Sequence, residues 1–178
     1  MLLSGSQDRA GVTSQEDVAQ PQPSVDELKP DTASDPASAG WRKLPAIRPY
    51  VRDLTARVTA KAATPYSKAR AISDFFADPR NHFTYSLQTA NGDSGDDLTD
   101  FLRNRIGYCQ QYAAAMGVML RLSGVPARVV LGYAHPVPDA DGTFRITTYD
   151  AHAWVEAYFT GVGWVPFDPP PTPGNRGG

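Results

Sequence analysis

Three residues that lie far apart in the sequence could together form a nucleophilic catalytic site: Cys109, His152 and Asp168. Cys109 is the only cysteine, so it cannot form a disulfide within the chain. A buried small apolar residue, a metal ligand and a nucleophile remain as its roles. It lies at the expected start of a helix, where unpaired backbone N–H groups and the helix dipole stabilise a thiolate. This position favours the nucleophile.

The other two residues supply what a reactive thiolate needs. The imidazole of His152 would take the thiol proton, or hold the thiolate in an ion pair. The carboxylate of Asp168 would orient the imidazole and stabilise its cation. Such a site attacks a carboxamide or peptide carbonyl. The resulting thioester is resolved by an amine, as in a transferase, or by water, as in a protease or amidase.

An oxyanion that forms during this attack needs hydrogen-bond donors. The backbone N–H of Cys109 is one natural donor, because it lies at the helix start. We take Tyr85 as the candidate for the second donor, and regard Arg145 and Gln110 as weaker options. A plain core role for Tyr85 fits the sequence at least as well.

Each member of the proposed triad also has a structural interpretation. A free cysteine is commonly a buried core residue, an isolated histidine is more often structural than catalytic, and Asp168 could form a turn at a strand end. Zinc would accept these ligand types, but the chain has no second cysteine and no short histidine spacing. A zinc-dependent hydrolase is therefore the weakest hypothesis, and we expect no metal and no cofactor.

Helices are expected to precede strands along the chain, which is typical of the α+β class. Apolar periodicity, proline positions and helix stop signals predict helices over residues 48–61, 65–77, 98–103 and 109–122, with the third capped by Asp96 or Asp97. Alternating patterns predict strands over residues 83–87, 127–133, 143–149, 151–159 and 164–167. The nucleophile would then sit at a helix start, packed on an antiparallel sheet.

The pairing register of the last two strands decides whether His152 and Asp168 can meet. Opposite residues in an antiparallel pair have a constant index sum, and the two residues share a face only if that sum is even. A sum of 320 would place them directly opposite each other, and 322 would place them diagonally, still within reach. An odd sum would place them on opposite faces. We predict an even sum.

Composition limits the organisation and the partners. Residues 1–40 are rich in proline and polar residues, which predicts a disordered or linker segment; residues 41–168 would form the domain and residues 169–178 a flexible Pro/Gly-rich tail. A net charge of −2 without a Lys/Arg cluster argues against nucleic acid as a partner. No apolar run is long enough to span a membrane, so we expect no membrane span in this chain.

Three blocks of the sequence resemble the transglutaminase-like core. They are Gly107-Tyr108-Cys109-Gln110-Gln111-Tyr112-Ala113 continuing to Tyr133, Asp150-Ala151-His152-Ala153-Trp154-Val155-Glu156, and Gly163-Trp164-Val165-Pro166-Phe167-Asp168-Pro169. The resemblance implies a papain-like α+β fold with Cys109, His152 and Asp168 as the triad. Members of this family transfer acyl groups through a thioester. Some crosslink glutamine to lysine, some hydrolyse peptides or amides, and some are inactive.

The resemblance is strongest to bacterial membrane-anchored members, whose core domain lies outside the cytoplasmic membrane. It implies an extracytoplasmic domain of a membrane-anchored parent protein, with cell-envelope peptides or proteins as substrates. The alternative function is a catalytically silent binding or scaffolding module that keeps the transglutaminase fold.

Overall fold

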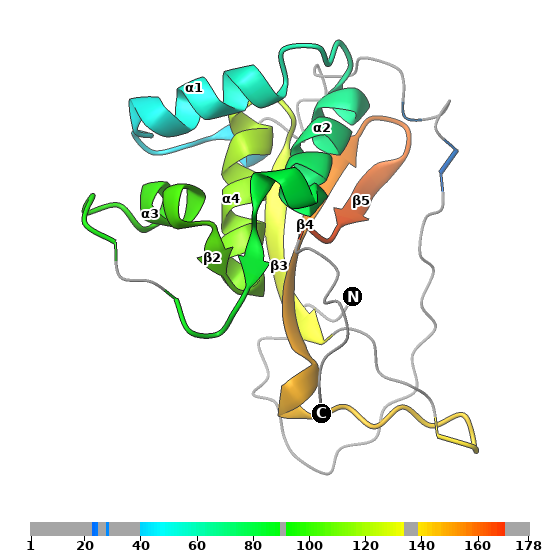
Figure 1. Ribbon diagram of the computed structural model, residues 1–178. Coiled ribbons are helices and arrows are strands. Elements are labelled where there is room, and N and C mark those ends of the chain that lie inside the picture. Colours follow the sequence, from blue (N-terminus) through cyan, green and yellow to red (C-terminus); the bar gives the residue numbers. More distant parts are fainter. Residues whose placement is uncertain (1–22, 25–27, 29–39, 90–91, 134–138, 170–178) are drawn as a thin grey trace.

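The computed structural model describes residues 23, 24, 28, 40–89, 92–133 and 139–169, and within them helices precede the main sheet (Figure 1). The α-helices are α1 (Pro49–Val58), α2 (Pro65–Ala77), α3 (Asp97–Asn104) and α4 (Cys109–Leu122). The strands are β1 (Thr84–Tyr85), β2 (Ile106–Gly107), β3 (Ala127–Tyr133), β4 (Ala151–Phe159) and β5 (Gly163–Phe167), with short 3-10 helices η2 (Pro79–Asn81) and η3 (Thr148–Asp150). The α+β class predicted from the sequence is confirmed.

Helix α4 is the central helix and packs against β3 and β4 (Figure 1). Its small residues allow this close approach: a Cβ added at Gly117 would lie 3.4 Å from the Val129 side chain and 4.0 Å from that of Val155. The helix ends before Gly124, whose φ of +83° is a conformation that glycine adopts without strain. Both predicted ends of this helix, Cys109 and Leu122, are confirmed.

The main sheet is antiparallel, with strand order β3-β4-β5. The hairpin turn between β4 and β5 contains Gly161, and β5 begins at Gly163; both glycines adopt positive φ. On the face of the sheet turned away from α4, Arg128 of β3 and Glu156 of β4 form an ion pair of 2.6 Å. This pair lies between directly opposite residues and so supports the register of β3 and β4.

Two strand predictions need correction. The segment 143–149 does not form a strand: apart from an isolated bridge at Phe144 it is irregular, and it ends in η3. The side chains of Thr147 and Asp150 close a turn there, because Thr147 N donates to Asp150 Oδ2 and Tyr149 N donates to Thr147 Oγ1. The strand predicted over 83–87 is only the two-residue β1, which pairs in parallel with β2.

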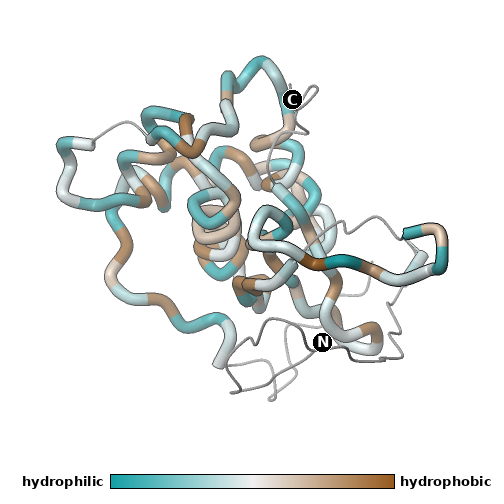
Figure 2. Tube along the Cα trace, turned by 90° about the horizontal axis from the view of Figure 1, so that it is seen from below, coloured by the Kyte–Doolittle hydropathy of each residue, from teal (hydrophilic) through white to brown (hydrophobic). Residues whose placement is uncertain are grey.

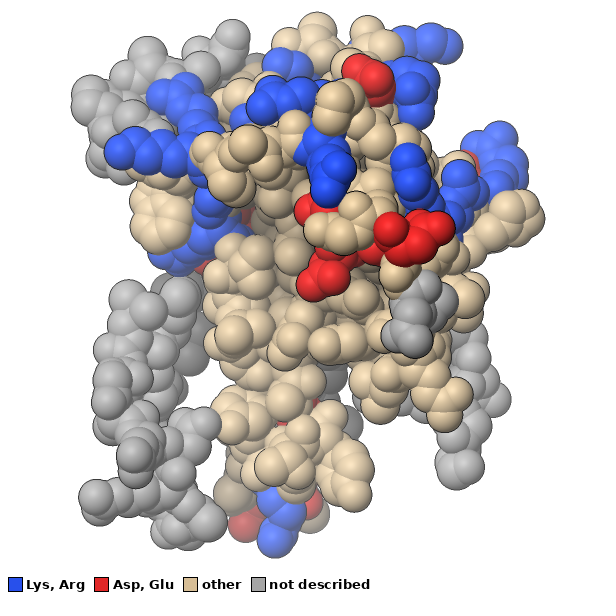
Figure 3. All heavy atoms as spheres, turned by 90° about the vertical axis from the view of Figure 1, so that its left-hand side faces the viewer, with Lys and Arg blue, Asp and Glu red and all other residues tan. Residues whose placement is uncertain are grey.

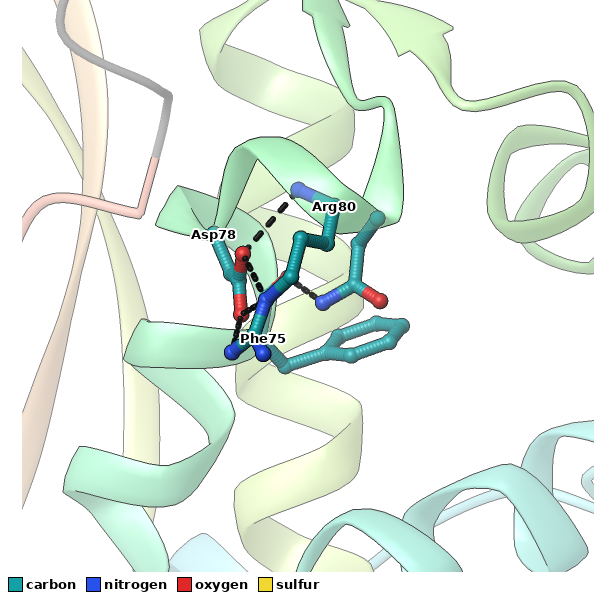
Figure 4. Close-up of polar contacts among 4 residues, drawn as sticks. Phe75, Asp78 and Arg80 are labelled. Carbon is teal, nitrogen blue, oxygen red and sulfur yellow. Dashed lines mark hydrogen bonds and ion pairs between the residues drawn. The ribbon is translucent and has the colours of Figure 1, made fainter.

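The connection from α2 into β1 is held by side-chain contacts around η2 (Figure 4). Asp78 caps η2 by accepting from Arg80 N, and its carboxylate also pairs with the Arg80 guanidinium at 2.6 Å. Hydrogen bonding from Arg80 lowers the pKa of Asp78. Asn81 Nδ2 donates to the carbonyl oxygen of Phe75 at 2.8 Å. These bonds direct the chain from α2 towards β1, which carries Tyr85.

Apolar residues gather between the helices and the sheet, around α4 (Figure 2). Aromatic rings from three helices and from the residue before β1 meet there in edge and tilted contacts: Phe76, Phe101, Tyr112 and Phe83. Leu28 also belongs to this core, with 4% of its surface exposed. Apart from residues 23, 24, 28 and 40, the segment predicted to be a linker lies outside the described residues, and so does 170–178 in the predicted tail.

None of the helices in the described part of the chain is long and apolar enough to cross a membrane.

Candidate active site

Cys109 is the first residue of α4 and is largely buried, with 8% of its surface exposed. The preceding residue, Tyr108, is extended and caps the helix. Its backbone N–H donates to Gln111 Oε1 at 3.2 Å, which fixes the first turn. The first N–H groups of a helix have no partner within the helix, so the thiol lies where the backbone dipoles favour a negative charge.

His152 and Asp168 are in direct contact. The Nε2 atom of His152 lies 3.0 Å from both carboxylate oxygens of Asp168. In the register of β4 and β5, Val155 pairs with Phe167, which gives an index sum of 322. The predicted even sum is therefore confirmed, in its diagonal form rather than the directly opposite one.

This contact also defines the roles of the two ring nitrogens. With Nε2–H donating to the carboxylate, a neutral imidazole carries its lone pair on Nδ1. The His152 side chain is 16% exposed and that of Asp168 is 45% exposed, so the pair lies at the rim of the sheet. The imidazole can therefore act as a base through Nδ1 while Asp168 holds its orientation.

Cys109 and the beginning of β4 lie towards the same end of the packed pair of α4 and β4. Gly117 touches Val155 of β4, and α4 and β4 run in the same direction (Figure 1). Going back from Gly117 to Cys109 covers about 12 Å of helix, at a rise of about 1.5 Å per residue. The same distance along β4, at about 3.3 Å per residue, leads back from Val155 to the beginning of the strand, where His152 lies.

The predicted oxyanion donor Tyr85 lies close to the same helix start. It pairs with Gly107, two residues before Cys109, in the parallel pair of β1 and β2. Its ring stacks on that of Tyr112, with centroids 6.4 Å apart and planes at 19°. Tyr112 lies one turn after Cys109 on α4, and Tyr85 itself is 37% exposed. The structure thus places Tyr85 near the start of α4.

The two weaker donor candidates lie in different settings. Gln110 is exposed, and its Oε1 accepts from the Tyr108 hydroxyl at 3.4 Å. Arg145 is exposed on the connection between β3 and β4, with its Nε 3.9 Å from an Asp139 carboxylate oxygen. Tyr85 is the one of the three whose strand pairs with the residues leading into Cys109.

Trp154 and Gly132 lie beside His152, and the sequence alone does not indicate that these two residues act together. The indole of Trp154 lies nearly parallel to the imidazole of His152, with centroids 6.5 Å apart and planes at 20°. Gly132 is directly opposite His152, and a Cβ there would lie only 3.0 Å from Trp154 Cη2. The missing side chain therefore makes room for the indole that borders the imidazole.

The described surface has two hollows near these elements. The smaller, of about 360 Å³, lies beside Asp168 and is lined by residues that include Tyr66, Arg70 and Phe167. The larger, of about 490 Å³, lies at the start of α3 against Gln111 and Ala114. The lining of the larger one contains none of the three proposed catalytic residues. The size of a hollow therefore does not mark the candidate site.

Charge is unevenly spread over the face shown in Figure 3. Lys and Arg lie over its upper part with Asp and Glu below them, and the region under these is mostly uncharged down to a small group at the bottom edge. This mostly uncharged region is at the height at which β3 ends and β4 begins in Figure 1. Among the described residues, no group of three His, Cys, Asp or Glu side chains could hold a metal ion.

A cysteine at the start of a central helix, packed on an antiparallel sheet that carries a His–Asp pair, defines a papain-like α+β fold. Residues 52–169 match the Transglutaminase-like superfamily, and the chain belongs to this family.

Known relatives agree with this assignment. A protein-glutamine gamma-glutamyltransferase of Pseudomonas aeruginosa is 37% identical over 137 residues, and the protein YebA of Bacillus subtilis is 34% identical over 138 residues. Each alignment covers 72% of this chain but only 20% and 18% of those relatives. The crystal structure of the periplasmic domain of TgpA from P. aeruginosa matches with a TM-score of 0.67 at 34% identity, covering 77% of this chain and 48% of that one.

Proposed function

We propose that this domain catalyses cysteine-dependent acyl transfer, with Cys109 as nucleophile, His152 as general base and acid, and Asp168 as the residue that orients His152. The main support for this proposal is the contact of His152 Nε2 with both carboxylate oxygens of Asp168 at 3.0 Å. Similarity to a relative named as a glutamine gamma-glutamyltransferase supports a carboxamide as the acyl donor.

The reaction has two halves. The Cys109 thiol gives its proton to Nδ1 of His152, and the thiolate attacks the carbonyl carbon of the acyl donor. As the C–N bond breaks, the imidazolium returns the proton to the leaving amine or ammonia, and a thioester remains on Cys109. An incoming amine or water then gives a proton to His152 and attacks the thioester, which releases the new amide or the acid and regenerates the thiol.

Two groups are suited to stabilise the oxyanion of each tetrahedral intermediate. The backbone N–H of Cys109 lies in the first turn of α4, and Tyr85 lies on β1, which pairs with β2 just before that turn. Removing one such donor in other enzymes costs about 10²–10³-fold in kcat. Tyr85 therefore acts on the transition state and would leave substrate binding largely unchanged.

The substrate is a protein or peptide of the cell envelope. The domain lies outside the cytoplasmic membrane in a membrane-anchored parent protein. Similarity to a periplasmic domain supports this location. The choice between an amine and water as acceptor depends on how well the occupied site excludes water.

The test is to incubate the protein with a glutamine-containing peptide and a fluorescent primary amine, and to follow peptide labelling and ammonia release. Wild type should label the peptide, or release ammonia alone if water is the acceptor. Cys109→Ser should do neither, and mass spectrometry of quenched wild type should find the acyl group on Cys109. A folded wild type that forms no acyl-enzyme with any amide or peptide donor would instead favour the silent scaffolding module.

A further inference from the structure

The acyl-transfer mechanism proposed above assigns no role to the outer edge of β3. Among the described strands, β3 pairs only with β4. Tyr158 N donates to Pro126 O at 2.9 Å, which shows that the even-numbered residues of this segment face β4 in the hydrogen-bond ladder. Because these directions alternate along an antiparallel strand, the N–H and C=O groups of Val129 and Leu131 point towards the outer edge.

The residues that point their backbone outwards also expose apolar side chains. Val129 is 44% exposed, Leu131 is 69% exposed and Tyr133 is 41% exposed. Proteins usually protect an exposed edge strand with charges, prolines or bulges, because such an edge pairs readily with other chains. The single charged residue of β3, Arg128, points to the opposite face and is paired with Glu156. This edge therefore lacks the features that usually prevent an edge strand from pairing with another chain.

The edge also leads to the reactive centre. Gly132 lies directly opposite His152. Gly117 of α4 touches Val129, and α4 runs opposite to β3 (Figure 1). The rise of about 12 Å from Gly117 back to Cys109 therefore corresponds to three to four residues forward along β3, to Gly132 and Tyr133. A segment paired along this edge would therefore end near the level of the start of α4.

We propose that the outer edge of β3 binds the acyl-donor polypeptide as an added, extended strand, which presents its carboxamide or peptide bond to Cys109. The proposal rests on the proposed function and specifies its substrate class: an extended stretch of polypeptide, rather than a free amide or a folded surface. The added strand bonds to the backbone of Val129 and Leu131, and alternate apolar side chains pack on these two residues. A permanent partner here would cover the reactive centre, which favours a substrate as the occupant.

Peptide binding can be measured without turnover in a Cys109→Ala background. The probe is a fluorescein-labelled ten-residue peptide of alternating valine and lysine with one central glutamine, followed by fluorescence anisotropy. Leu131→Lys should weaken its binding about tenfold or more, because a charge on the edge opposes strand addition. Phe144→Lys is the matched control, since Phe144 is apolar and 55% exposed but lies outside β3. The control should bind as the parent does.

Backbone methylation tests the pairing itself. Only every second N–H of an added strand faces β3, so a scan of single N-methyl groups along the peptide should weaken binding at alternate positions. Each sensitive position should lose about tenfold, the worth of one hydrogen bond. Effects without this two-residue period, or no measurable binding at 1 mM peptide, would overturn the proposal. So would a wild-type dimer that Leu131→Lys dissociates without a change in peptide binding, which would make the edge a contact between two copies.

Failure of the β3 edge proposal can be distinguished from failure of the acyl-transfer proposal. If Cys109 forms an acyl-enzyme equally well with a glutamine dipeptide and with the ten-residue peptide, and Leu131→Lys changes neither rate, acyl transfer stands and the β3 edge is not its substrate site. If the peptide binds with the alternating pattern but Cys109 is never acylated, the edge is a binding site and the acyl-transfer chemistry is wrong.

Discussion

His152 of β4 and the residue that follows β5, Asp168, lie diagonally across the strand pair, with Nε2 of the imidazole 3.0 Å from both oxygens of the carboxylate. The contact spans the two strands joined by the hairpin, so its geometry is set by the backbone ladder rather than by a loop. A carboxylate on Nε2 directs the basic lone pair to Nδ1 and stabilises the imidazolium that forms when the thiol is deprotonated.

Asp168→Asn should therefore lower activity with little change in stability. An amide keeps the shape of the side chain but cannot stabilise the cation, and its NH₂ group would favour the wrong tautomer. We expect kcat to fall by about 10²–10⁴-fold. The Asp168 side chain is 45% exposed, so Tm should change by no more than a few degrees.

Asp74→Asn is the matched control for this substitution. Asp74 is also exposed and also pairs with a basic side chain, Arg70 at 3.1 Å, but on α2. It should retain full activity and lose at most about 0.5 kcal/mol of stability, as is usual for an exposed i, i+4 pair. Equal loss of activity in both variants would mean that the Asp168 effect is not specific to His152.

Gly132→Ala should disturb His152 through its neighbour. The new Cβ would lie 3.0 Å from Cη2 and 3.3 Å from Cζ3 of Trp154, so the indole must shift, and it stacks beside the imidazole. We expect a loss of about 1–3 kcal/mol of stability from overpacking and a lower kcat with KM little changed.

Gly40→Ala serves as the control, because nothing lies within 4 Å of a Cβ at that position. A Gly132→Ala enzyme with an unaltered kcat and an unaltered pH–rate profile would show that the indole does not help to position His152.

Tyr112→Phe probes a hydroxyl that is fully buried. The Tyr112 hydroxyl has no hydrogen-bond partner among the described residues, and burial, followed by the proximity of Tyr85, raises the pKa of Tyr112. Removing an unpartnered buried hydroxyl relieves its desolvation cost, so the free energy of unfolding at pH 7 should stay within about 1 kcal/mol of wild type, or rise.

The pH dependence of the same variant follows from linkage. The folded state keeps the Tyr112 proton above pH 10, whereas the unfolded state releases it near its ordinary pKa of about 10. The stabilising contribution is thus present below pH 10 and is lost as pH rises, by up to about 1.4 kcal/mol per pH unit. Denaturant unfolding from pH 9 to 11 should show a shallower decline in Tyr112→Phe than in wild type. Identical slopes would contradict burial as the cause of the pKa shift.

The long periodic elements could be predicted from the sequence alone. The ends of α4, β3 and β4 were predicted to the residue, because each has a clear apolar period and is bounded by glycine, proline or turn residues. Whether His152 and Asp168 share a face of the sheet depends only on whether the index sum of opposite residues in β4 and β5 is even. The observed register shows that it is. The sequence alone could not distinguish an index sum of 320 from one of 322, because both place the two side chains on the same face of the sheet.

Other features depend on contacts that no local pattern encodes. The pair of β1 and β2 is two residues long on each side and joins segments about twenty residues apart, so it has no period to detect. The segment 143–149 alternates like a strand, but the Thr147 and Asp150 side chains bond to the local backbone and turn it. Gly132 is an ordinary glycine in the sequence, and its role is visible only once Trp154 lies over it.

The pairing of Cys109 with His152 can be tested by the rate of Cys109 alkylation with iodoacetamide, measured from pH 4 to 10 in wild type and in His152→Ala. Cys109 is the only thiol, so the labelled site is unambiguous. We expect wild type to be alkylated rapidly already below pH 7, and His152→Ala to react there at least about tenfold more slowly, because without the imidazole the thiol keeps its proton. An alkylation rate below pH 7 that is the same in wild type and in His152→Ala, or a folded protein that is not alkylated, would contradict the assignment of Cys109 and His152 as a catalytic pair.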